Sequence, residues 1–387
     1  MSPALNIDSK LLERVNSALA DIRAGKMVIL VDDEDRENEG DLCMAAQFVT
    51  AEAINFMATH GRGLICVPLT EEHVEKLGLP MMHAPGRAGP TLGTAFTLSV
   101  EARHGVTTGI SAADRAHTTR VLVNPTCKPE DLVTPGHVFP LKSKNGGVLV
   151  RTGQTEGSVD LARLAGLIPA GMICEIMNED GSMARMPDLE VFAKKHGLCI
   201  LTIADLIQYR LQTERLVRRT TEQDVTLDQT GTTWRAVVYE VRTNGRQFLA
   251  LVKGDISGAV PTLTRMHSGS TIADTFASTL KDGGRNLREA IRAIEEEGRG
   301  VIVYIPPRGD LTHEVDGYGA ASSPEPHAND PLREFGLGAQ VLADLGLHKI
   351  RLLTNNPRKI AGIHGYGLDV AESVSLAQMS KARGKPI

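Results

Sequence analysis

The sequence VILVDDEDRENEGD, residues 28–41, is the stretch around which the chain is organised. Its four leading apolar residues predict a buried strand. The ten residues that follow carry seven carboxylates and a single arginine, Arg36. Such dense negative charge repels itself unless a cation or a basic substrate lies within it, and carboxylate oxygens are preferred ligands of Mg²⁺. A solvated acidic loop is the alternative, but Asn38 and Gly40 so soon after a buried strand favour a tight turn.

The composition is that of a globular protein with room for two domains. At 387 residues the chain can build two cores, and its 42% hydrophobic and 23% charged residues are ordinary for a soluble protein. The net charge of −5 provides no basic field, so nucleic acid is not an expected partner. No apolar run could cross a bilayer and the N-terminus lacks a signal-like apolar core, so no membrane partner is expected. Five cysteines without CxxC spacing indicate reduced thiols and a cytoplasmic protein.

Helical and strand-like patterns alternate through about the first 210 residues. A first helix, ended by Gly25, is expected from apolar residues that share one face: Leu12, Val15, Leu19 and Ile22. After residues 28–31, further strands are expected at residues 64–67, 94–100, 121–123, 148–150, 172–176 and 199–202. Helices are expected between them at residues 51–60, 71–77, 111–119, 158–165, 188–196 and 203–212. This alternation predicts a layered α/β or α+β domain.

The pattern changes at residues 211–233, which are polar and predict either a linker or an entering edge strand. A second α/β pattern follows, with strands expected at residues 234–241, 248–253, 300–305 and 350–353. Helices are expected at residues 287–297, with Asn286 as the cap and Gly298 at the end, and at residues 339–345. We therefore predict two domains, at residues 1–213 and 214–387.

Two loops of the first domain hold polar groups that suit chemistry. Residues 105–115, GVTTGISAADR, place hydroxyl groups beside glycines before a helix start, which suits a phosphate or a sugar hydroxyl but equally a plain helix cap. Residues 134–141, TPGHVFPL, place His137 in a loop punctuated by proline and glycine. A lone loop histidine is more often incidental than catalytic, yet imidazole is the commonest proton shuttle near neutral pH.

Two strand ends of the same domain carry further candidates. Residues 148–160, VLVRTGQTEGSVD, predict a short strand that ends at Arg151 and turns into a helix. An arginine beside the N–H groups of a helix N-terminus forms a phosphate cradle, and a capping box around Thr155 is the alternative. Residues 170–175, AGMICE, predict an apolar strand that ends at Glu175. Burial there can raise the pKa of the carboxyl group so that it acts as a base, whereas a solvated edge position would leave it inert.

Five motifs together resemble the 3,4-dihydroxy-2-butanone-4-phosphate synthase family of riboflavin biosynthesis: DDEDRENEGD, GVTTGISAADR, PGHVFPL, RTGQTEGSVDL and CE. They occur in the family's order, and the resemblance extends from about residue 10 to about residue 212. It implies a three-layer α-β-α domain with a mixed sheet. It also implies a lyase that converts ribulose 5-phosphate to 3,4-dihydroxy-2-butanone 4-phosphate and formate. The family's cofactor is Mg²⁺ or Mn²⁺, with two ions per site possible, and its active sites lie at a homodimer interface.

The resemblance assigns roles to individual residues. Its two proton-transfer positions correspond to His137 and Glu175, which serve proton abstraction, dehydration, rearrangement and loss of formate. Its metal ligands correspond to Glu37 and Gln154, and Asp32 to Asp35 would supply a supporting negative field. The substrate contacts carried over are Arg36, Glu37, Asp41, Arg151, Thr152, Gly153, Gln154 and Thr155.

Gln154 departs from the family pattern, in which the loop reads Arg-x-Gly-His-Thr-Glu and the histidine is the second metal ligand. The amide oxygen of glutamine is a hard, neutral ligand that suits Mg²⁺ better than a nitrogen ligand does. We hypothesise that metal binding survives, weakened or made through a water molecule, and that the preference moves from Mn²⁺ towards Mg²⁺.

The second domain resembles GTP cyclohydrolase II, with the best match at residues 332–346 and 351–359. In that family three cysteines bind zinc, and their places here are taken by Ser270, Lys281 and Gly283. No cysteine follows Cys199, so a thiolate zinc site cannot form and no zinc is expected. The family's QEGRG stretch is replaced by PPRGD at residues 306–310. The sequence predicts a domain without cyclohydrolase activity that serves dimerisation, regulation or nucleotide binding through residues 354–359. The alternatives are a bifunctional enzyme and a non-catalytic scaffold or regulator of the pathway.

Overall fold

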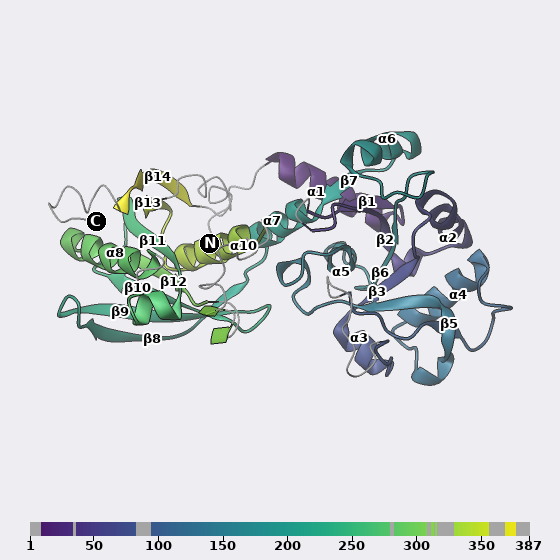
Figure 1. The fold of residues 1–387 in the computed structure, drawn as a ribbon, viewed down its shortest axis with the longest axis horizontal. Coiled ribbons are helices and arrows are strands. Elements are labelled where there is room, and N and C mark those ends of the chain that lie inside the picture. Colours follow the sequence, from purple (N-terminus) through teal and green to yellow (C-terminus); the bar gives the residue numbers. More distant parts are fainter. Residues whose placement is uncertain are drawn as a thin grey trace. The chain divides into compact units, whose positions relative to one another are not determined.

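The computed structural model divides the chain into two compact units, one at Ser9–Tyr209 and one that begins at Arg210 (Figure 1). It describes residues 9–33, 36–82, 94–278, 282–307, 311–312, 314–315, 329–355 and 368–376. The division falls within helix α7 (Ile203–Thr213), whose last residue is the domain boundary expected from the sequence. Within the described ranges, every helix falls short of the length and apolar character needed to cross a bilayer.

The first unit is built on a mixed sheet of seven strands in the order β4-β5-β3-β6-β2-β1-β7. The strands are β1 (Val28–Val31), β2 (Gly40–Ala45), β3 (Cys66–Leu69), β4 (Val100–Ala102), β5 (Leu132–Lys142), β6 (Gly171–Glu175) and β7 (Ile200–Thr202). Strand β1 pairs with β2 in antiparallel and with β7 in parallel fashion, and β2 pairs with β6 in antiparallel fashion. The four residues of β1 are all buried, as their apolar sequence predicts.

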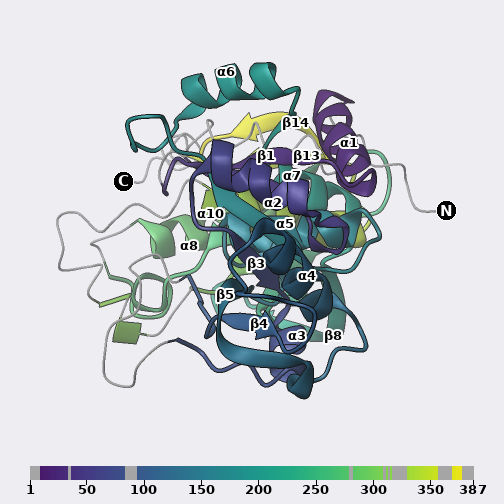
Figure 2. The ribbon, with the colours of Figure 1, turned by 90° about the vertical axis from the view of Figure 1, so that its right-hand side faces the viewer.

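Helices cover both faces of this sheet and complete three layers (Figure 2). Alternate residues of β1 separate the two sides. Leu30 faces α5, because a Cβ atom on Gly157 of that helix would lie 2.6 Å from its Cδ2 atom. Ile29 and Val31 belong to the opposite core, together with residues of α2, α4 and α6. The helices are α1 (Ser9–Arg23), which packs on α5, then α2 (Ala51–Phe56), α3 (Glu71–Lys76), α4 (Ala112–Val123), α5 (Gln154–Leu164) and α6 (Met186–His196).

Several local predictions for this unit are wrong, each for an identifiable reason. Residues 121–123, predicted as a strand, form the last turn of α4, where Leu122 and Val123 are buried in the core. Residues 148–150 are not a strand, because a 3₁₀ turn at Gly147–Leu149 precedes α5. Residues 134–141 are not a loop but part of β5, which lies between β3 and β4. In α1, Leu11 and Ala18 are buried beside the expected Val15, Leu19 and Ile22, whereas Leu12 is only partly buried.

The second unit contains another mixed sheet of seven strands, in the order β14-β13-β11-β12-β10-β9-β8. The strands are β8 (Val217–Leu227), β9 (Thr232–Val241), β10 (Gln247–Lys253), β11 (Thr262–Ser268), β12 (Gly300–Ile305), β13 (Lys349–Leu353) and β14 (Asp369–Val374). Of the two alternatives for residues 211–233, the edge strand is the one that forms, because β8 pairs only with β9 among the described strands.

Two long helices pack on this second sheet. Helix α8 (Gly283–Glu297) buries Ala290, Ile291 and Ile294 in a core that includes Trp234. It ends at Gly298, whose φ of 77° is a left-handed C-cap, as predicted. It starts earlier than predicted, with Asp282 rather than Asn286 as its N-cap residue. Helix α10 (Asn329–Asp344) is likewise longer than predicted and contacts β12 and β8.

Candidate active site

The loop between β1 and β2 is held by the buried carboxylate of Asp32, at the end of β1. Its oxygens accept hydrogen bonds from the backbone N–H groups of Glu37, at 3.2 Å, and Glu39, at 2.8 Å. The same carboxylate lies 2.5 Å from Nη1 of Arg36. Asn38 has a φ of 53°, which confirms the expected tight turn. Asp32 therefore organises this loop, whereas Glu34 and Asp35 of the expected acidic field lie outside the described residues.

Arg36 joins this loop to the start of α5. Its Nη2 atom lies 3.0 Å from Oε1 of Glu37, and its Nη1 atom donates to Oε1 of Gln154 at 2.9 Å. Gln154 is buried and donates through Nε2 to the carbonyl oxygen of Glu39 at 3.3 Å. The structure thus brings together Arg36, Glu37 and Gln154, and the oxygens of Glu37 and Gln154 converge on one cationic group.

Asp41 and Glu175 lie directly opposite each other on the antiparallel strands β2 and β6. Burial and the nearby charge of Glu175 raise the pKa of Asp41 well above its ordinary value. Burial also raises the pKa of Glu175, with a further contribution from Glu37. Burial and the charge of Glu37 raise the pKa of Glu39 in the same way. These carboxyl groups compete for ionisation, so this region of the site favours a proton or a cation.

The position of Glu175 is constrained by the segment that precedes β3. Its Oε2 atom accepts a hydrogen bond from the backbone N–H of Leu64 at 2.8 Å. A Cβ atom on Gly63 would lie 2.5 Å from that same Oε2 atom and 2.6 Å from the carbonyl oxygen of Glu175. Only glycine leaves room for this approach, so the carboxylate has a fixed orientation.

The second candidate loop forms the N-terminus of α5. Nη1 of Arg151 lies 2.6 Å from Oε2 of the buried Glu156, and its Nη2 atom donates to the hydroxyl of Thr94 at 3.1 Å. Gly153 is the N-cap residue, and a Cβ atom there would lie 2.5 Å from Arg151 Nη1 and 3.2 Å from Arg36 Nη2. Thr152 and Thr155 are buried beside it. Two guanidinium groups therefore meet at a helix N-terminus, which is a geometry suited to phosphate.

His137 stands apart from this cluster within the chain. It lies on β5, which is separated from β6 by β3, and its side chain is 43% exposed. Its Nδ1 atom lies 3.1 Å from Oε1 of Glu101 on β4. In the loop at residues 105–115, the polar groups hydrogen-bond to one another. The carboxylate of Asp114 accepts from the hydroxyl of Thr107, at 2.7 Å, and from the N–H of Gly109, at 3.0 Å. Ser111 caps α4, so the capping alternative holds there.

Two residues of the site were not predicted from the sequence. Arg185, at the start of α6, donates to the carbonyl oxygens of Glu37 and Asn38 and fixes the far side of the acidic loop. Glu156 neutralises Arg151 from inside the core, where burial raises its pKa and the ion pair offsets part of that rise. Arg185 is distant in sequence and belongs to no motif. Glu156, in contrast, follows Arg151 within the quoted loop and could have been proposed as its partner.

The donor set of the site fits a divalent cation that also takes ligands from a substrate. In the described part of the chain, no three histidine, cysteine, aspartate or glutamate side chains are close enough to enclose a metal ion. Glu37 and Gln154 offer two oxygen donors, and the mutual repulsion of Asp41 and Glu175 favours added positive charge. Mg²⁺ is commonly bound by one or two protein carboxylates with the rest of its shell from water and substrate.

In the second unit, the places of the family's zinc cysteines hold groups that do not bind zinc as thiolates. The hydroxyl of Ser270 donates to Oε1 of Glu314 at 2.6 Å and accepts from the N–H of Ala273. Gly283 has no side chain, and Lys281 lies outside the described residues, as do residues 308–310 and 356–359 of the other expected motifs. Nearby, Asp274 binds the ring of His267 at 3.1 Å. Ser270 and Asp274 are thus held by hydrogen bonds, whereas the buried Nδ1 atom of His267 has no hydrogen-bond partner among the described residues.

Comparisons with known proteins agree with this division. The family model of 3,4-dihydroxy-2-butanone 4-phosphate synthase matches residues 16–209, and that of GTP cyclohydrolase II matches residues 218–375. The riboflavin biosynthesis protein RibBA of Aquifex aeolicus is 50% identical over 384 residues, covering 94% of this chain and 92% of the relative. RibBA of Bacillus mycoides is 47% identical over 386 residues, covering 97% and 96%.

A solved structure is similar over both units. It is the crystal structure of RibBX from A. baumannii, described as a two-domain 3,4-dihydroxy-2-butanone 4-phosphate synthase. It has 41% sequence identity to this chain and a TM-score of 0.75, covering 94% of this chain and 98% of that one. The chain therefore belongs to the 3,4-dihydroxy-2-butanone 4-phosphate synthase family of riboflavin biosynthesis, and a GTP cyclohydrolase II-type domain follows its synthase domain.

Proposed function

We propose that the first domain carries out the family's reaction, conversion of ribulose 5-phosphate to 3,4-dihydroxy-2-butanone 4-phosphate and formate, with Glu175 and His137 as its proton-transfer groups. The assignment of Glu175 is supported by the carboxylate pair Asp41–Glu175, and that of the phosphate contacts by the meeting of the Arg36 and Arg151 guanidinium groups at Gly153. Burial raises the pKa of Glu175, which makes its carboxylate a stronger base for the proton abstraction and dehydration steps. The two arginines hold the phosphate, and Asp41 contacts the sugar hydroxyls.

The remaining substrate contacts come from the same two loops. Glu37 meets the sugar beside Arg36, while the N–H groups around Gly153 face the phosphate at the start of α5. Thr152 and Thr155 add hydroxyl groups from buried positions. These residues fix one pose for the substrate, which lowers the entropic cost of each proton transfer.

Glu37 and Gln154 are the residues that we propose as protein ligands of Mg²⁺ or Mn²⁺, with room for two ions when the substrate supplies further oxygens. A divalent ion supplies an electrophile that acidifies the carbon-bound protons next to the sugar carbonyl. Arg36 now bridges the proposed ligand oxygens, so it is the group that must yield when an ion binds. A released guanidinium remains within reach of the substrate phosphate.

We further propose a cytoplasmic homodimer in which His137 of one protomer serves the site of its partner. In its own chain His137 is half exposed on β5, pairs with Glu101, and is separated from the strand of Glu175 by β3. A dimer contact through this face brings imidazole to the carboxylates without any change within the chain. All five cysteines are free, as suits a reducing compartment.

For the second domain we propose that cyclohydrolase activity is absent. Ring opening of GTP in that family depends on zinc held by thiolates, and Ser270 and Gly283 supply none. A bifunctional enzyme is the second candidate, because relatives of similar length are named RibBA and one rice relative is described as probably bifunctional. The loss of all three cysteine positions favours the first candidate. A scaffold without any activity is the third.

One assay separates the three candidates. The purified protein is incubated with ribulose 5-phosphate and Mg²⁺, with and without EDTA, and formate is followed by NMR; the assay is repeated with GTP and Zn²⁺. Formate that appears from the sugar phosphate alone, and only without EDTA, supports the first candidate. Formate from both substrates supports the bifunctional enzyme, and formate from neither supports the scaffold.

A matched pair of variants tests the role of Glu175. Glu175→Gln is expected to lower the rate of formate release by at least about a hundredfold, because it removes a proton-transfer group. Glu179→Gln is the control, since that side chain is 91% exposed and also removes one negative charge. Equal rates for the two variants would exclude Glu175 from the chemistry.

A further inference from the structure

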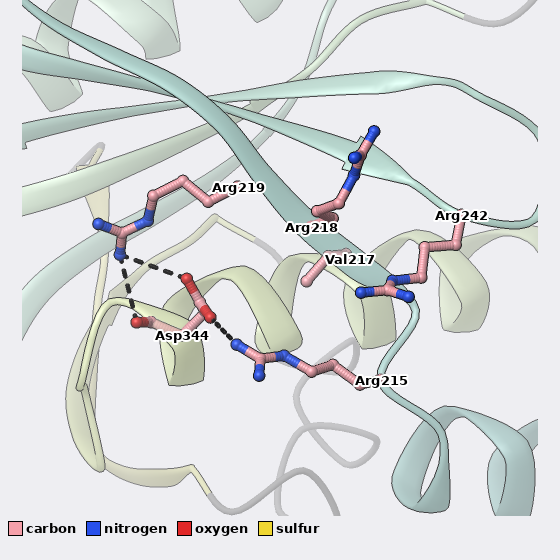
Figure 3. A pocket seen from close by; sticks show the side chains of 6 residues that line it. All are labelled: Arg215, Val217, Arg218, Arg219, Arg242 and Asp344. Carbon is pink, nitrogen blue, oxygen red and sulfur yellow. Dashed lines mark hydrogen bonds and ion pairs between the residues drawn. The ribbon is translucent and has the colours of Figure 1, made fainter.

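A pocket of about 420 Å³ lies in the second unit, outside the candidate active site, where β8 begins and α10 ends. Four arginines, an aspartate and a valine line it: Arg215, Val217, Arg218, Arg219, Arg242 and Asp344 (Figure 3). Its walls thus carry four positive charges against one negative charge. No motif in the sequence predicted it, because its residues come from three separate segments.

Asp344 holds two of these arginines in place. Figure 3 shows Arg215 and Arg219 both bound to its carboxylate, with Nη2 of Arg219 at 3.3 Å from Oδ2. The hydroxyl of Tyr239 donates to the same Oδ2 atom at 2.9 Å, and the guanidinium of Arg219 lies 5.8 Å from the centre of the Tyr239 ring. Burial opposes ionisation of Asp344, but the Tyr239 hydrogen bond and the two arginines lower its pKa. The two guanidinium groups are therefore positioned in advance.

The other two arginines differ in how far they are neutralised. Arg218 lies 3.2 Å from the carboxylate of Glu240, its register partner on β9, which does not line the pocket. Arg242 is anchored through its backbone, whose N–H donates to the carbonyl oxygen of Leu216 at 2.8 Å. Among the described residues, no carboxylate lies within 4.0 Å of the Arg242 guanidinium, so this charge is available to a ligand.

We propose that this pocket binds a small molecule that bears a diphosphate group, with Arg215, Arg219 and Arg242 as its contacts. Arginine presents paired N–H donors that match the oxygens of a phosphate, and neighbouring guanidinium groups suit adjacent phosphates. A volume of about 420 Å³ is within the range of pockets that enclose nucleotide-sized ligands. Net charge remains positive even after Glu240 and Glu222 are counted, since Glu222 lies 3.2 Å from Arg219.

A small anion is favoured over a nucleic acid. The chain as a whole carries a net charge of −5, so no extended basic field surrounds the pocket to follow a polynucleotide backbone. The positive charge is confined to one hollow, bounded by β8 and the end of α10. The pocket shares no residue with those proposed for lyase chemistry. A negative result for the pocket would therefore leave the lyase assignment intact.

The test is a calorimetric titration of the full-length protein with inorganic pyrophosphate, in EDTA and at constant ionic strength. Arg242→Gln and Arg215→Gln remove pocket charges, and Arg292→Gln is the control, because it removes one exposed arginine that pairs with Glu289 on α8. Arg151→Gln excludes binding at the phosphate site of the first domain. Circular dichroism and thermal unfolding confirm that each variant is folded.

Saturable binding that weakens at least about tenfold in Arg242→Gln and Arg215→Gln, yet persists in Arg292→Gln and Arg151→Gln, supports the pocket. Absence of saturable binding to the unaltered protein overturns the proposal. So does an equal loss in Arg242→Gln and Arg292→Gln, which would mean diffuse charge attraction, or a loss confined to Arg151→Gln. A single-stranded oligonucleotide that competes with pyrophosphate would identify a nucleic-acid surface and also overturn it.

Discussion

Arg36 contacts three different side chains at once, Asp32, Glu37 and Gln154, and thereby joins the acidic loop to the start of α5. The sequence identified these residue types, because the motifs place them in loops at strand and helix ends. It did not identify which of them are partners. Arg36 and Gln154, for example, are hydrogen-bonded although they are 118 residues apart in the sequence. Contacts of that range arise from the fold, and no local pattern encodes them.

Replacing Gln154 with histidine is expected to change the metal preference. The amide oxygen suits Mg²⁺, whereas an imidazole nitrogen suits Mn²⁺ better, so Gln154→His should raise Mn²⁺-supported activity relative to Mg²⁺-supported activity by about tenfold. Rates of formate release across titrations of each metal measure this ratio. The unaltered protein is the reference, and an unchanged ratio would show that residue 154 does not contact the ion.

The carboxyl group of Asp41 is expected to cost stability. Folding raises its pKa above the ordinary value of 3.8, so the folded state binds the proton more tightly than the unfolded state. The stability that the folded state has with Asp41 protonated is fully present below the unfolded-state pKa. It is lost as the pH rises through the folded-state pKa, because the carboxyl group then ionises in its buried position. Asp41→Asn removes the charge and should raise the free energy of unfolding by about 1 kcal/mol at neutral pH, while lyase activity falls.

Urea unfolding in EDTA, at pH 7 and at about pH 3, tests this expectation, because EDTA removes cations that would compensate the charge. The higher unfolding free energy of Asp41→Asn should be present at pH 7. It should be absent at the lower pH, where Asp41 is protonated in both the folded and the unfolded state. Equal stability of the two proteins at pH 7 would contradict the raised pKa.

At the scale of elements, the inner strands β1 and β6 and the edge strand β7 were predictable, whereas the inner strand β2 and strand β5 were not. Residues 28–31 and 172–174 are continuous apolar runs whose side chains are all buried, so the pattern alone identified them. Strand β5 contains Pro135, Gly136 and Pro140, which mimic a loop even though the strand pairs with β3 and β4. The apolar residues 121–123 extend a helix because burial against the core outweighs their strand preference.

The close approach of Gly63 to β6 gives a prediction for one element. Gly63→Ala places a methyl group 2.5 Å from Oε2 and 2.6 Å from the carbonyl oxygen of Glu175, so strand or side chain must move. We expect a loss of about 1–3 kcal/mol in unfolding free energy and a lower rate of formate release. Gly283→Ala is the control, since its new methyl group would meet only ordinary contacts at 3.7 Å and beyond. Similar effects of both substitutions would rule out crowding against Glu175 as the cause.

At the scale of the whole molecule, the sequence predicts two α/β domains because two separate alternating patterns flank a polar stretch, and two compact units are present. The arginine pocket was not predictable, because Arg215, Arg242 and Asp344 become neighbours only once β8, β9 and α10 have folded. Nor could the sequence show that β3 lies between the strands that carry His137 and Glu175.

The separation of His137 from Glu175 predicts complementation between protomers. His137→Ala and Glu175→Ala should each be nearly inactive alone. Mixed after joint unfolding and refolding, they should recover about one quarter of the normal activity, since half of the dimers are mixed and each of these has one complete site. Formate release measures the recovery, with size-exclusion chromatography to verify the dimer. No recovery on mixing would place both residues in the same chain's site.

The missing side chain of Gly153 has a consequence for the direction in which a substrate enters. It lets the guanidinium groups of Arg36 and Arg151 meet at the first turn of α5, where the helix adds its own partial positive charge. Asp41 and Glu175 concentrate negative charge on β2 and β6. On the proposed assignment, a sugar phosphate would meet a site with positive charge at one end and carboxylates at the other, and reversed entry would press its phosphate against those carboxylates. This polarity would then select the orientation of the molecule before any of its hydroxyl groups is distinguished.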